Sequence, residues 1–280
     1  NFKDYNIAYY QELLIMIENI FLRIAGFSIT INLGDSLNYP FSKKKLSDDI
    51  NKYLKGFIHP KEKNSDFKIN IKQEVDNDVI YKKKEKSFYF KIFEVERNQI
   101  NCNYEISFGQ ISFIIRYGIL MFLSKNNGFL MHGSAVSIDN KAYIFTGPSG
   151  AGKSTIMKML NSKHPALADD SVIIKWEKGE YYLYQTPMIE KESWVHKQSK
   201  KYPIGGIFFL NKSRDFKAEK IISKKEIIMR LISQLFVNQE QTKTQVNNLI
   251  SFIKKFDQFR IISFSKNQKK LLEFFSKNIV

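Results

Sequence analysis

Apolar and polar side chains alternate with two different periods along the first part of the chain. From Tyr9 to Phe21 apolar residues recur at steps of three and four, which predicts a helix with one buried face. Beyond it, alternation at every second residue predicts strands of an antiparallel sheet with one face in water. The predicted strands are Phe27 to Leu33, Phe67 to Val75, Val79 to Lys83, Ser87 to Glu96 and Ile100 to Tyr104. We therefore expect residues 1–105 to form a small, sheet-rich domain.

Residues 106–280 have the pattern of an α/β domain. A helix is predicted from Ile106 to Ser124, ended by the turn signal Asn126-Asn127-Gly128. Phe129 to Ile138 and Lys141 to Phe145 are predicted to form a hairpin through the two-residue turn Asp139-Asn140. Further strands are predicted at 166–168, 172–175, 181–184, 206–210 and 259–264, and further helices at 153–160, 224–236 and 245–256. The expected fold class is α/β (α+β), a mixed-sheet domain preceded by a smaller sheet-rich domain.

Composition indicates a globular protein. Apolar residues make up 43% of the 280 residues, enough for a substantial core. The single cysteine, Cys102, cannot form an internal disulfide, and no secretory signal is recognisable before Tyr10, so we expect a cytoplasmic location. The apolar stretch from Ile106 to Leu123 is interrupted by Gln110 and Arg116, which favours a buried helix over a membrane span.

The formal net charge of +16 attracts anions, such as nucleotides, nucleic acid, acidic membranes or an acidic peptide. The lysine runs at 43–45 and 82–84 lie beside turn-like or strand-like sequence and match no nucleic-acid motif. Such runs are typical of solvated faces. Nucleic-acid binding is therefore not expected.

A complete phosphate-loop motif occupies Gly147-Pro148-Ser149-Gly150-Ala151-Gly152-Lys153-Ser154, and Thr155 follows it. A predicted strand enters the motif and a predicted helix leaves it, which is the context that the motif requires. The glycines let backbone N–H groups approach phosphate oxygens, and Lys153 can reach the β and γ phosphates. Ser154 is expected to bind Mg²⁺. The motif predicts a site for ATP or GTP with Mg²⁺, and the alternative is a glycine-rich turn with an incidental lysine.

Asp169 and Asp170 are the candidate acidic groups. They follow the predicted strand at 166–168 and so stand at a strand end, where open α/β sheets bind their ligands. Adjacent side chains on an extended chain point to opposite sides, so one carboxylate can face Mg²⁺ while the other faces an acceptor. The alternative is an aspartate that caps the next element. His132 lies in an apolar strand, which by itself is typical of a core histidine.

Three blocks of this sequence resemble, in order and approximate spacing, the catalytic domain of bacterial HPr kinase/phosphorylase and its small relatives. The blocks are Met131 to Val136, Gly147 to Thr155 and Leu167 to Val172. That family has a P-loop fold related to phosphoenolpyruvate carboxykinase. The resemblance implies that Asp170 accepts the proton of the substrate hydroxyl and that Asp169 supports the metal or the orientation. It likewise implies that His132 lies near the phosphates, that Lys153 contacts them and that Ser154 is a magnesium ligand.

Other parts of the sequence match the family less well. Gln185-Thr186-Pro187-Met188 resembles a polar-Thr-Pro turn of the small relatives and makes Glu190 a candidate second metal ligand. The glycine-rich segment that engages HPr is missing, so HPr is not the expected substrate. The late catalytic arginine has only candidate equivalents, which are Arg214, Arg230 and Arg260. Relatives often form hexamers, which makes a homo-oligomer one option.

The motifs leave three functions open. The first is a kinase that uses ATP and Mg²⁺ to phosphorylate a hydroxyl, expected to be serine, on a peptide or protein such as a precursor peptide. The basic N-terminal domain would then hold the peptide by edge pairing. The second is the same chemistry on free serine or a sugar, and the third is a non-catalytic, nucleotide-gated binding module. Both aspartates beside an intact phosphate loop argue against the third.

Overall fold

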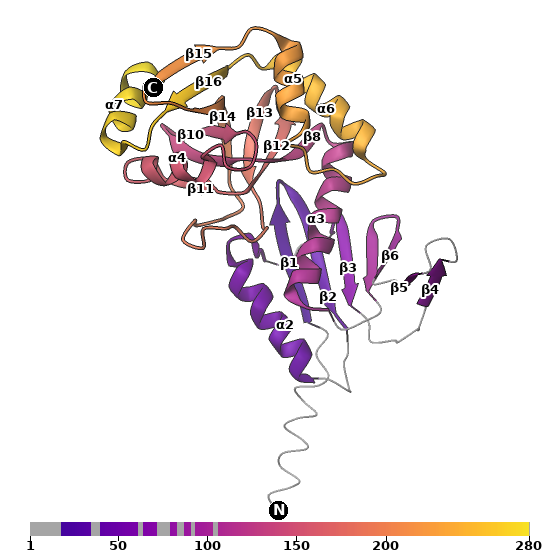
Figure 1. Cartoon of the computed structure of the whole chain (residues 1–280). Coiled ribbons are helices and arrows are strands. Elements are labelled where there is room, and N and C mark those ends of the chain that lie inside the picture. The colour runs from indigo at the N-terminus through magenta and orange to yellow at the C-terminus, as the bar shows by residue number, and fades with distance from the viewer. Residues whose placement is uncertain are drawn as a thin grey trace, which may run out of the picture. The chain divides into compact units, whose positions relative to one another are not determined.

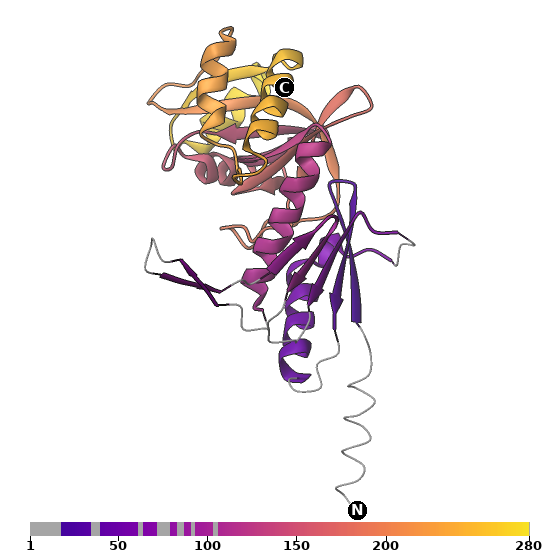
Figure 2. The same ribbon diagram turned by 90° about the vertical axis from the view of Figure 1, so that its right-hand side faces the viewer.

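The computed structural model describes residues 18–34, 40–60, 64–71, 79–82, 87–90, 93–102 and 106–279. The chain divides into two compact units, one up to Ile115 and the other from Arg116 onward. Helix α3 (Phe108–Lys125) runs across this division. Two views of the chain are given in Figures 1 and 2. Each unit is described by itself.

The N-terminal unit is built on a five-stranded sheet with the order β1-β2-β3-β7-β6. Its strands are β1 (Glu18–Ile24), β2 (Phe27–Leu33), β3 (Phe67–Ile71), β6 (Phe93–Glu96) and β7 (Gln99–Cys102). Between β2 and β3 come helix α2 (Pro40–Tyr53) and the short 3-10 helix η1 (Lys55–Phe57). Strands β4 (Val79–Lys82) and β5 (Ser87–Phe90) pair antiparallel in a separate two-stranded sheet.

This sheet is mixed, and the prediction of an antiparallel sheet was wrong. Strand β3 runs parallel to both β2 and β7. Parallel neighbours need a crossover, and helix α2, which was not predicted, lies in the one between β2 and β3. Lys43–Lys45 therefore lie in a helix and not beside a turn.

The first predicted helix is also corrected where it can be compared. Residues 18–21 belong to strand β1, because Ile20, Leu22 and Ile24 are buried at every second position. Residues 9–17 of that prediction lie outside the described part of the chain. So do residues 72–75, 83 and 103–104 at the ends of predicted strands. The predicted strand from Ser87 to Glu96 is two strands, because β5 pairs with β4 and β6 pairs with β7.

The second unit confirms the predicted α/β class with a nine-stranded mixed sheet. The strand path is β11-β9-β10-β14-β13-β12-β8, with β16 beside β14 and β15 beside β16. The pairs β10–β14 and β14–β16 are parallel. The strands are β8 (Gly128–His132), β9 (Ser134–Ile138), β10 (Lys141–Thr146), β11 (Ala166–Ala168), β12 (Ser171–Glu177), β13 (Glu180–Gln185), β14 (Lys201–Lys212), β15 (Lys217–Lys220) and β16 (Phe259–Phe264).

Helices pack on this sheet through two apolar cores. Helices α4 (Lys153–Leu160) and α7 (Gln268–Asn278) share one core, and α5 (Lys224–Ile232) and α6 (Thr242–Lys255) share the other (Figure 1). Strand β10 supplies both cores in alternation: Ala142 and Ile144 face α5 and α6, whereas Tyr143 and Phe145 face α4 and α7. A strand buried on both faces is typically a continuous apolar run, as Ala142 to Phe145 is in β10. Strand β15 and helix α7 were not predicted.

The predicted strand from Phe129 to Ile138 is two strands, interrupted at Gly133. Strand β8 pairs with β12, whereas β9 pairs with β10 and β11. A Cβ atom on Gly133 would lie 3.2 Å from Ile144 Cγ2 and 3.3 Å from the Phe145 carbonyl oxygen, so a larger residue would crowd strand β10. The chain changes neighbours at this glycine.

No described helix is both long enough and apolar enough to cross a bilayer.

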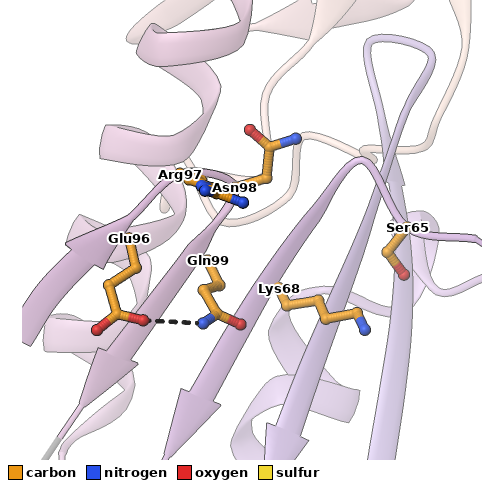
Figure 3. Close-up of a pocket in the computed structure, with 6 residues that line it drawn as sticks. All are labelled: Ser65, Lys68, Glu96, Arg97, Asn98 and Gln99. Atoms are coloured by element: carbon orange, nitrogen blue, oxygen red, sulfur yellow. Dashed lines mark hydrogen bonds between the residues drawn. The ribbon is translucent and has the colours of Figure 1, made fainter.

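The N-terminal unit has an open cavity of about 670 Å³ beside the turn between β6 and β7 (Figure 3). All its lining residues are polar or charged, unlike the mostly apolar walls of typical small-molecule sites. They are Ser65, Lys68, Glu96, Arg97, Asn98 and Gln99.

Cys102 offers a test of the packing of the N-terminal unit. It is the only cysteine of the chain and lies buried in β7, where burial raises the pKa of its thiol to about 12. Because the thiolate is the reactive form, we expect no labelling by a disulfide reagent in native buffer near about pH 8, and complete labelling after unfolding. Equally fast labelling in both conditions would contradict this packing.

Candidate active site

The phosphate-loop motif lies between the end of β10 at Thr146 and the start of α4 at Lys153, which is the predicted strand–loop–helix setting. Gly147, Gly150 and Gly152 have φ of +143°, +79° and +104°, values that side chains with a Cβ rarely adopt. The Ala151 N–H donates to the Pro148 carbonyl at 3.1 Å, which closes the loop on itself.

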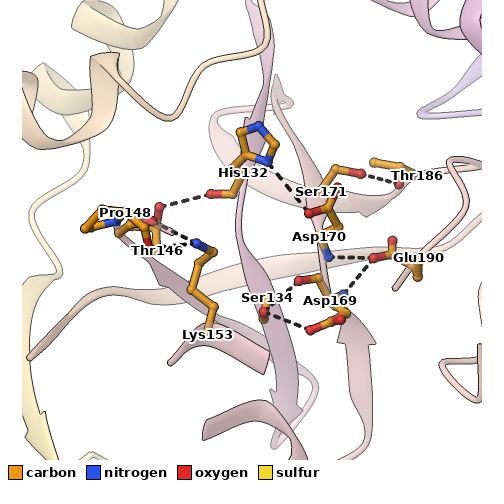
Figure 4. A network of polar contacts seen from close by, with 11 residues as sticks. His132, Ser134, Thr146, Pro148, Lys153, Asp169, Asp170, Ser171, Thr186 and Glu190 are labelled. Atoms are coloured by element: carbon orange, nitrogen blue, oxygen red, sulfur yellow. Dashed lines mark hydrogen bonds and ion pairs between the residues drawn. The ribbon is translucent and has the colours of Figure 1, made fainter. Parts of the chain in front are cut away.

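Lys153 lies against the loop that precedes it. Its Nζ donates to the carbonyl oxygens of Gly147 at 2.8 Å and Pro148 at 3.2 Å (Figure 4). Burial lowers the pKa of Lys153, and the negative charges of Asp170 and Asp169 oppose that shift. The ammonium group and the two carboxylates therefore share one electrostatic environment.

Strand direction explains why the loop and the aspartates meet. Strand β9 is antiparallel to both β10 and β11, so β10 and β11 run the same way. Their carboxyl ends, at Thr146 and Ala168, consequently lie at the same edge of the sheet. Ligands of open α/β sheets bind beyond this edge.

The aspartate segment is held across from the bend at Gly133. Ala168 pairs with Ala135 and Ser171 with His132, so Asp169 and Asp170 fall between two paired stretches. The Gly133 N–H donates to the Asp170 carbonyl at 3.1 Å. The bend thus fixes the backbone on which both carboxylates stand.

Asp169 is buried and leaves one oxygen unpartnered. Ser134 Oγ donates to the Asp169 carbonyl oxygen at 2.8 Å and lies 3.3 Å from Oδ1. Asp169 Oδ2 is buried without a hydrogen-bond partner. A buried carboxylate oxygen in this state is chemically suited to Mg²⁺, which prefers oxygen ligands and completes its shell with water and substrate phosphate. Residues 18–279 contain, where described, no cluster of three His, Cys, Asp or Glu side chains placed to hold a metal by themselves.

Asp170 is more accessible and faces His132. Its Oδ1 lies 3.8 Å from His132 Nδ1, and the two side chains are 54% and 41% exposed. His132 holds the pKa of Asp170 below its ordinary value, with help from Lys153 and Lys197 and against the effect of burial. Because 3.8 Å exceeds hydrogen-bond distance, we regard this contact as electrostatic. Asp170 is therefore a carboxylate near neutral pH.

His132 is fixed from behind by the connection between α5 and α6. The backbone N–H of His132 donates to the Gln234 carbonyl at 2.7 Å. The centre of its ring lies 3.8 Å from the centre of the Phe236 ring. Neither Gln234 nor Phe236 was anticipated, because nothing in the sequence near Gly147 or Asp169 points to a segment so distant in the chain.

Glu190 has contacts other than those of the metal ligand that the sequence suggested. Its Oε2 accepts the backbone N–H groups of Asp169 at 2.9 Å and Asp170 at 2.6 Å. Its Oε1 lies 3.3 Å from Lys197 Nζ, a partner that was not predicted. The carboxylate therefore faces the aspartate backbone and a lysine.

The segment Gln185 to Met188, which precedes Glu190, also makes hydrogen bonds to the strands of the site. Gln185 Nε2 donates to the carbonyl oxygens of Leu167 and His196 at 2.7 and 2.9 Å. The Thr186 and Ser171 hydroxyls lie 2.9 Å apart in a hydrogen bond. These contacts join the end of β13 to β11 and β12.

The candidate late arginines lie in other surroundings. Arg230 pairs with Glu226 on α5 at 2.8 Å, and Arg260 donates to the Asn278 carbonyl at 3.0 Å. Arg214 is exposed after β14. Among the described contacts, none of these three arginines reaches the aspartates.

Comparisons with known proteins identify the family. The model of the family described as "SynChlorMet cassette protein ScmC" matches residues 108–267, more than half of the chain. The chain belongs to the ScmC family. No curated protein matches this ScmC-family chain. Among solved structures, the "Structure of the Hpr(Ser) kinase/phosphatase from Coxiella burnetii" matches at 14% identity with a TM-score of 0.28, covering 52% of this chain and 91% of that one.

Two glycines of the loop give a matched test of its geometry. Alanine at either position must adopt a positive φ, which costs about 1–2 kcal/mol. At Gly152 a Cβ would also lie 2.9 Å from Phe264 Cζ, whereas at Gly150 nothing lies within 4 Å. We expect Gly152→Ala to cost about 1–3 kcal/mol more than Gly150→Ala in unfolding free energy, because it overpacks the core.

Urea unfolding followed by tryptophan fluorescence measures this difference. Both tryptophans of the chain, Trp176 and Trp194, belong to the second unit. Equal destabilisation by the two substitutions would contradict the contact between the loop and Phe264.

Proposed function

We propose that the chain is an ATP- and Mg²⁺-dependent kinase that transfers the γ-phosphate to a hydroxyl group of a peptide or protein. Serine is the proposed acceptor residue. One observation carries the proposal: an ionised, accessible carboxylate, Asp170, shares a sheet edge with a complete phosphate loop. Phosphate binding alone would need only the loop. The second group is what transfer to a hydroxyl requires.

On the phosphate side, the backbone N–H groups of residues 147–152 and the start of α4 would hold the anion. Lys153 Nζ would exchange its carbonyl partners for β- and γ-phosphate oxygens, a charge-assisted and therefore stronger contact. Ser154 Oγ and the unpartnered Oδ2 of Asp169 are the proposed ligands of Mg²⁺. The bound ion would neutralise charge on the transferring phosphate.

On the acceptor side, Asp170 is the proposed proton acceptor. The acceptor oxygen forms a bond to the γ phosphorus while the bond to the ADP oxygen breaks, and the hydroxyl proton passes to the Asp170 carboxylate. His132 would keep this carboxylate ionised and oriented. Positioning of the acceptor at Asp170 would supply most of the remaining acceleration.

A peptide acceptor is proposed over a small molecule on two grounds. The net charge of +16 favours an acidic partner. The N-terminal unit contains a five-stranded sheet, and extended peptides commonly bind to sheet edges. We assign peptide binding to that unit.

Replacement of Asp170 tests the proposed base. We expect Asp170→Asn to lower the rate of phosphate transfer at least about 100-fold, the usual contribution of a general base, while the triphosphate still binds. Transfer of label from γ-labelled ATP to serine-containing acidic peptides, with the phosphosite mapped, measures the rate. Asp215→Asn, a change in an exposed loop after β14, is the matched control and should behave as wild type. Full turnover in Asp170→Asn would rule out this assignment.

Replacement of Lys153 tests the phosphate site separately. We expect Lys153→Met to weaken binding of the triphosphate about 10- to 100-fold, because a hydrogen bond to a charged group is worth about 1.5–3 kcal/mol. Calorimetric titration of the wild type and the variant measures the change. Unchanged affinity would contradict the phosphate contact.

The acceptor assay also separates the other two functions. Phosphorylation of free serine or a sugar without peptide would identify a small-molecule kinase. Tight triphosphate binding by the wild type without transfer to any acceptor would identify a nucleotide-gated binding module.

A further inference from the structure

The connection between β13 and β14, residues 186–200, buries two opposite charges that the steps above do not use. The side chains of Glu190 and Lys197 are 2% and 15% exposed. Burial of a charge is costly unless it is paired and hydrogen-bonded. A surface loop does not need a buried ion pair for its own packing. The hydrogen bonds of the pair therefore indicate which part of the protein the loop stabilises.

Glu190 holds the backbone of the two aspartates. Its Oε2 accepts the N–H of Asp169 and the N–H of Asp170, at 2.9 and 2.6 Å (Figure 4). These peptides lie at the bend between β11 and β12, outside the strand ladders. Two successive N–H groups that converge on one oxygen form an anion-binding concavity, filled here by the protein's own carboxylate.

The opposite side of the same segment is held by the bend at Gly133. Gly133 N–H donates to the Asp170 carbonyl, and Ser134 Oγ donates to the Asp169 carbonyl. The N–H groups of the aspartates thus bind Glu190, while their carbonyl groups bind β9 and the residue before it. Removal of Glu190 would release one side of this clamp.

Lys197 reduces the free-energy cost of burying the Glu190 carboxylate. Its Nζ lies 3.3 Å from Glu190 Oε1. Burial raises the pKa of Glu190 and lowers that of Lys197, and the attraction between the two groups opposes both shifts. The two N–H donors on Oε2 favour the ionised carboxylate, so we regard the pair as charged.

We propose that Glu190, paired with Lys197, is a positioning residue that fixes the backbone of Asp169 and Asp170 so that one carboxylate faces the metal and the other the acceptor. The catalytic meaning of this role rests on the function proposed above. The contact itself does not, and it can be measured in the chain without nucleotide or acceptor.

The same loop offers a matched control two residues further on. Glu192 Oε1 lies 2.8 Å from Lys158 Nζ on α4, and its Oε2 accepts the Trp194 Nε1–H at 3.0 Å. Glu192 is thus also a paired loop glutamate, but these two partners lie outside the aspartate pair. Loss of its charge tests the effect of disturbing the loop as such.

The experiment compares Glu190→Ala, the double variant Glu190→Gln with Lys197→Met, and Glu192→Gln in the full chain. The double variant removes both charges and keeps an acceptor oxygen of the same shape. Amide hydrogen exchange at Asp169 and Asp170, kcat, KM for the peptide and triphosphate affinity are measured for each.

For Glu190→Ala we expect faster exchange at both aspartate amides and a fall in kcat of about 100-fold, the effect of a misplacement of about 1 Å, with triphosphate affinity little changed. The double variant should keep both amides protected, and Glu192→Gln should match the wild type in every measurement. This contrast separates positioning from general loop stability.

The inference is overturned if both amides stay protected in Glu190→Ala, or if Glu192→Gln impairs exchange and kcat as much. If Glu190→Ala does not fold, the double variant decides: protected amides support the inference, and rapid exchange refutes it. A wild type that transfers phosphate to no acceptor refutes the proposed function alone, because amide exchange still decides the role of Glu190.

Discussion

The bend at Gly133 is the constraint on which the candidate site depends. At this residue the chain leaves its pairing with β12 and begins its pairing with β10 and β11. The facing chain bends at the same level, at Asp169 and Asp170, and so carries its side chains out of the ladder. Glycine fits here because a Cβ would press on Ile144 and on the Phe145 carbonyl. The sheet thus brings the acidic pair to the edge where β10 delivers the phosphate loop.

Charge balance around the aspartates comes from several directions. The charges of Lys153 at the start of α4 and of Lys197 in the β13–β14 connection act on Asp170, and His132 at the end of β8 faces it. Burial lowers the pKa of both lysines, and the carboxylate of Asp170 counteracts that shift in each. Such a site can remain ionised while partly shielded from water, which is the condition under which fixed charges act most strongly on phosphate.

Much of the second unit could be predicted because its signals are local. The apolar run before Gly147 and the helical spacing after Lys153 identify the strand and helix by themselves, and Asp139-Asn140 adopts the positive φ of a tight hairpin turn. The division of Phe129 to Ile138 could not be seen, because both halves are apolar and only their partners differ. Helix α7 was missed even though its Leu271 and Phe275 are buried four residues apart.

Most of the remaining failures come from contacts between residues far apart in the chain. Strand β3 pairs in parallel with β2 and β7, and the alternation of apolar and polar residues does not indicate which strands pair or in which direction. Helix α2 is rich in lysine and polar residues, so its apolar face, marked by Leu46 and Ile50, is narrow. Glu190 was recognised as a residue of the site, but its hydrogen bonds to backbone N–H groups leave no trace in the sequence. Lys197 and Phe236 were missed for the same reason.

We propose that Asp169 and the phosphate loop belong to one metal–triphosphate site. Calorimetric titration of the triphosphate with and without Mg²⁺ tests this proposal most directly. In the wild type we expect Mg²⁺ to tighten binding, because the buried Oδ2 of Asp169 would hold the ion and the ion would add positive charge for the phosphates. In Asp169→Asn most of that tightening should be lost, while binding without Mg²⁺ stays similar. Equal tightening by Mg²⁺ in both proteins would contradict the account.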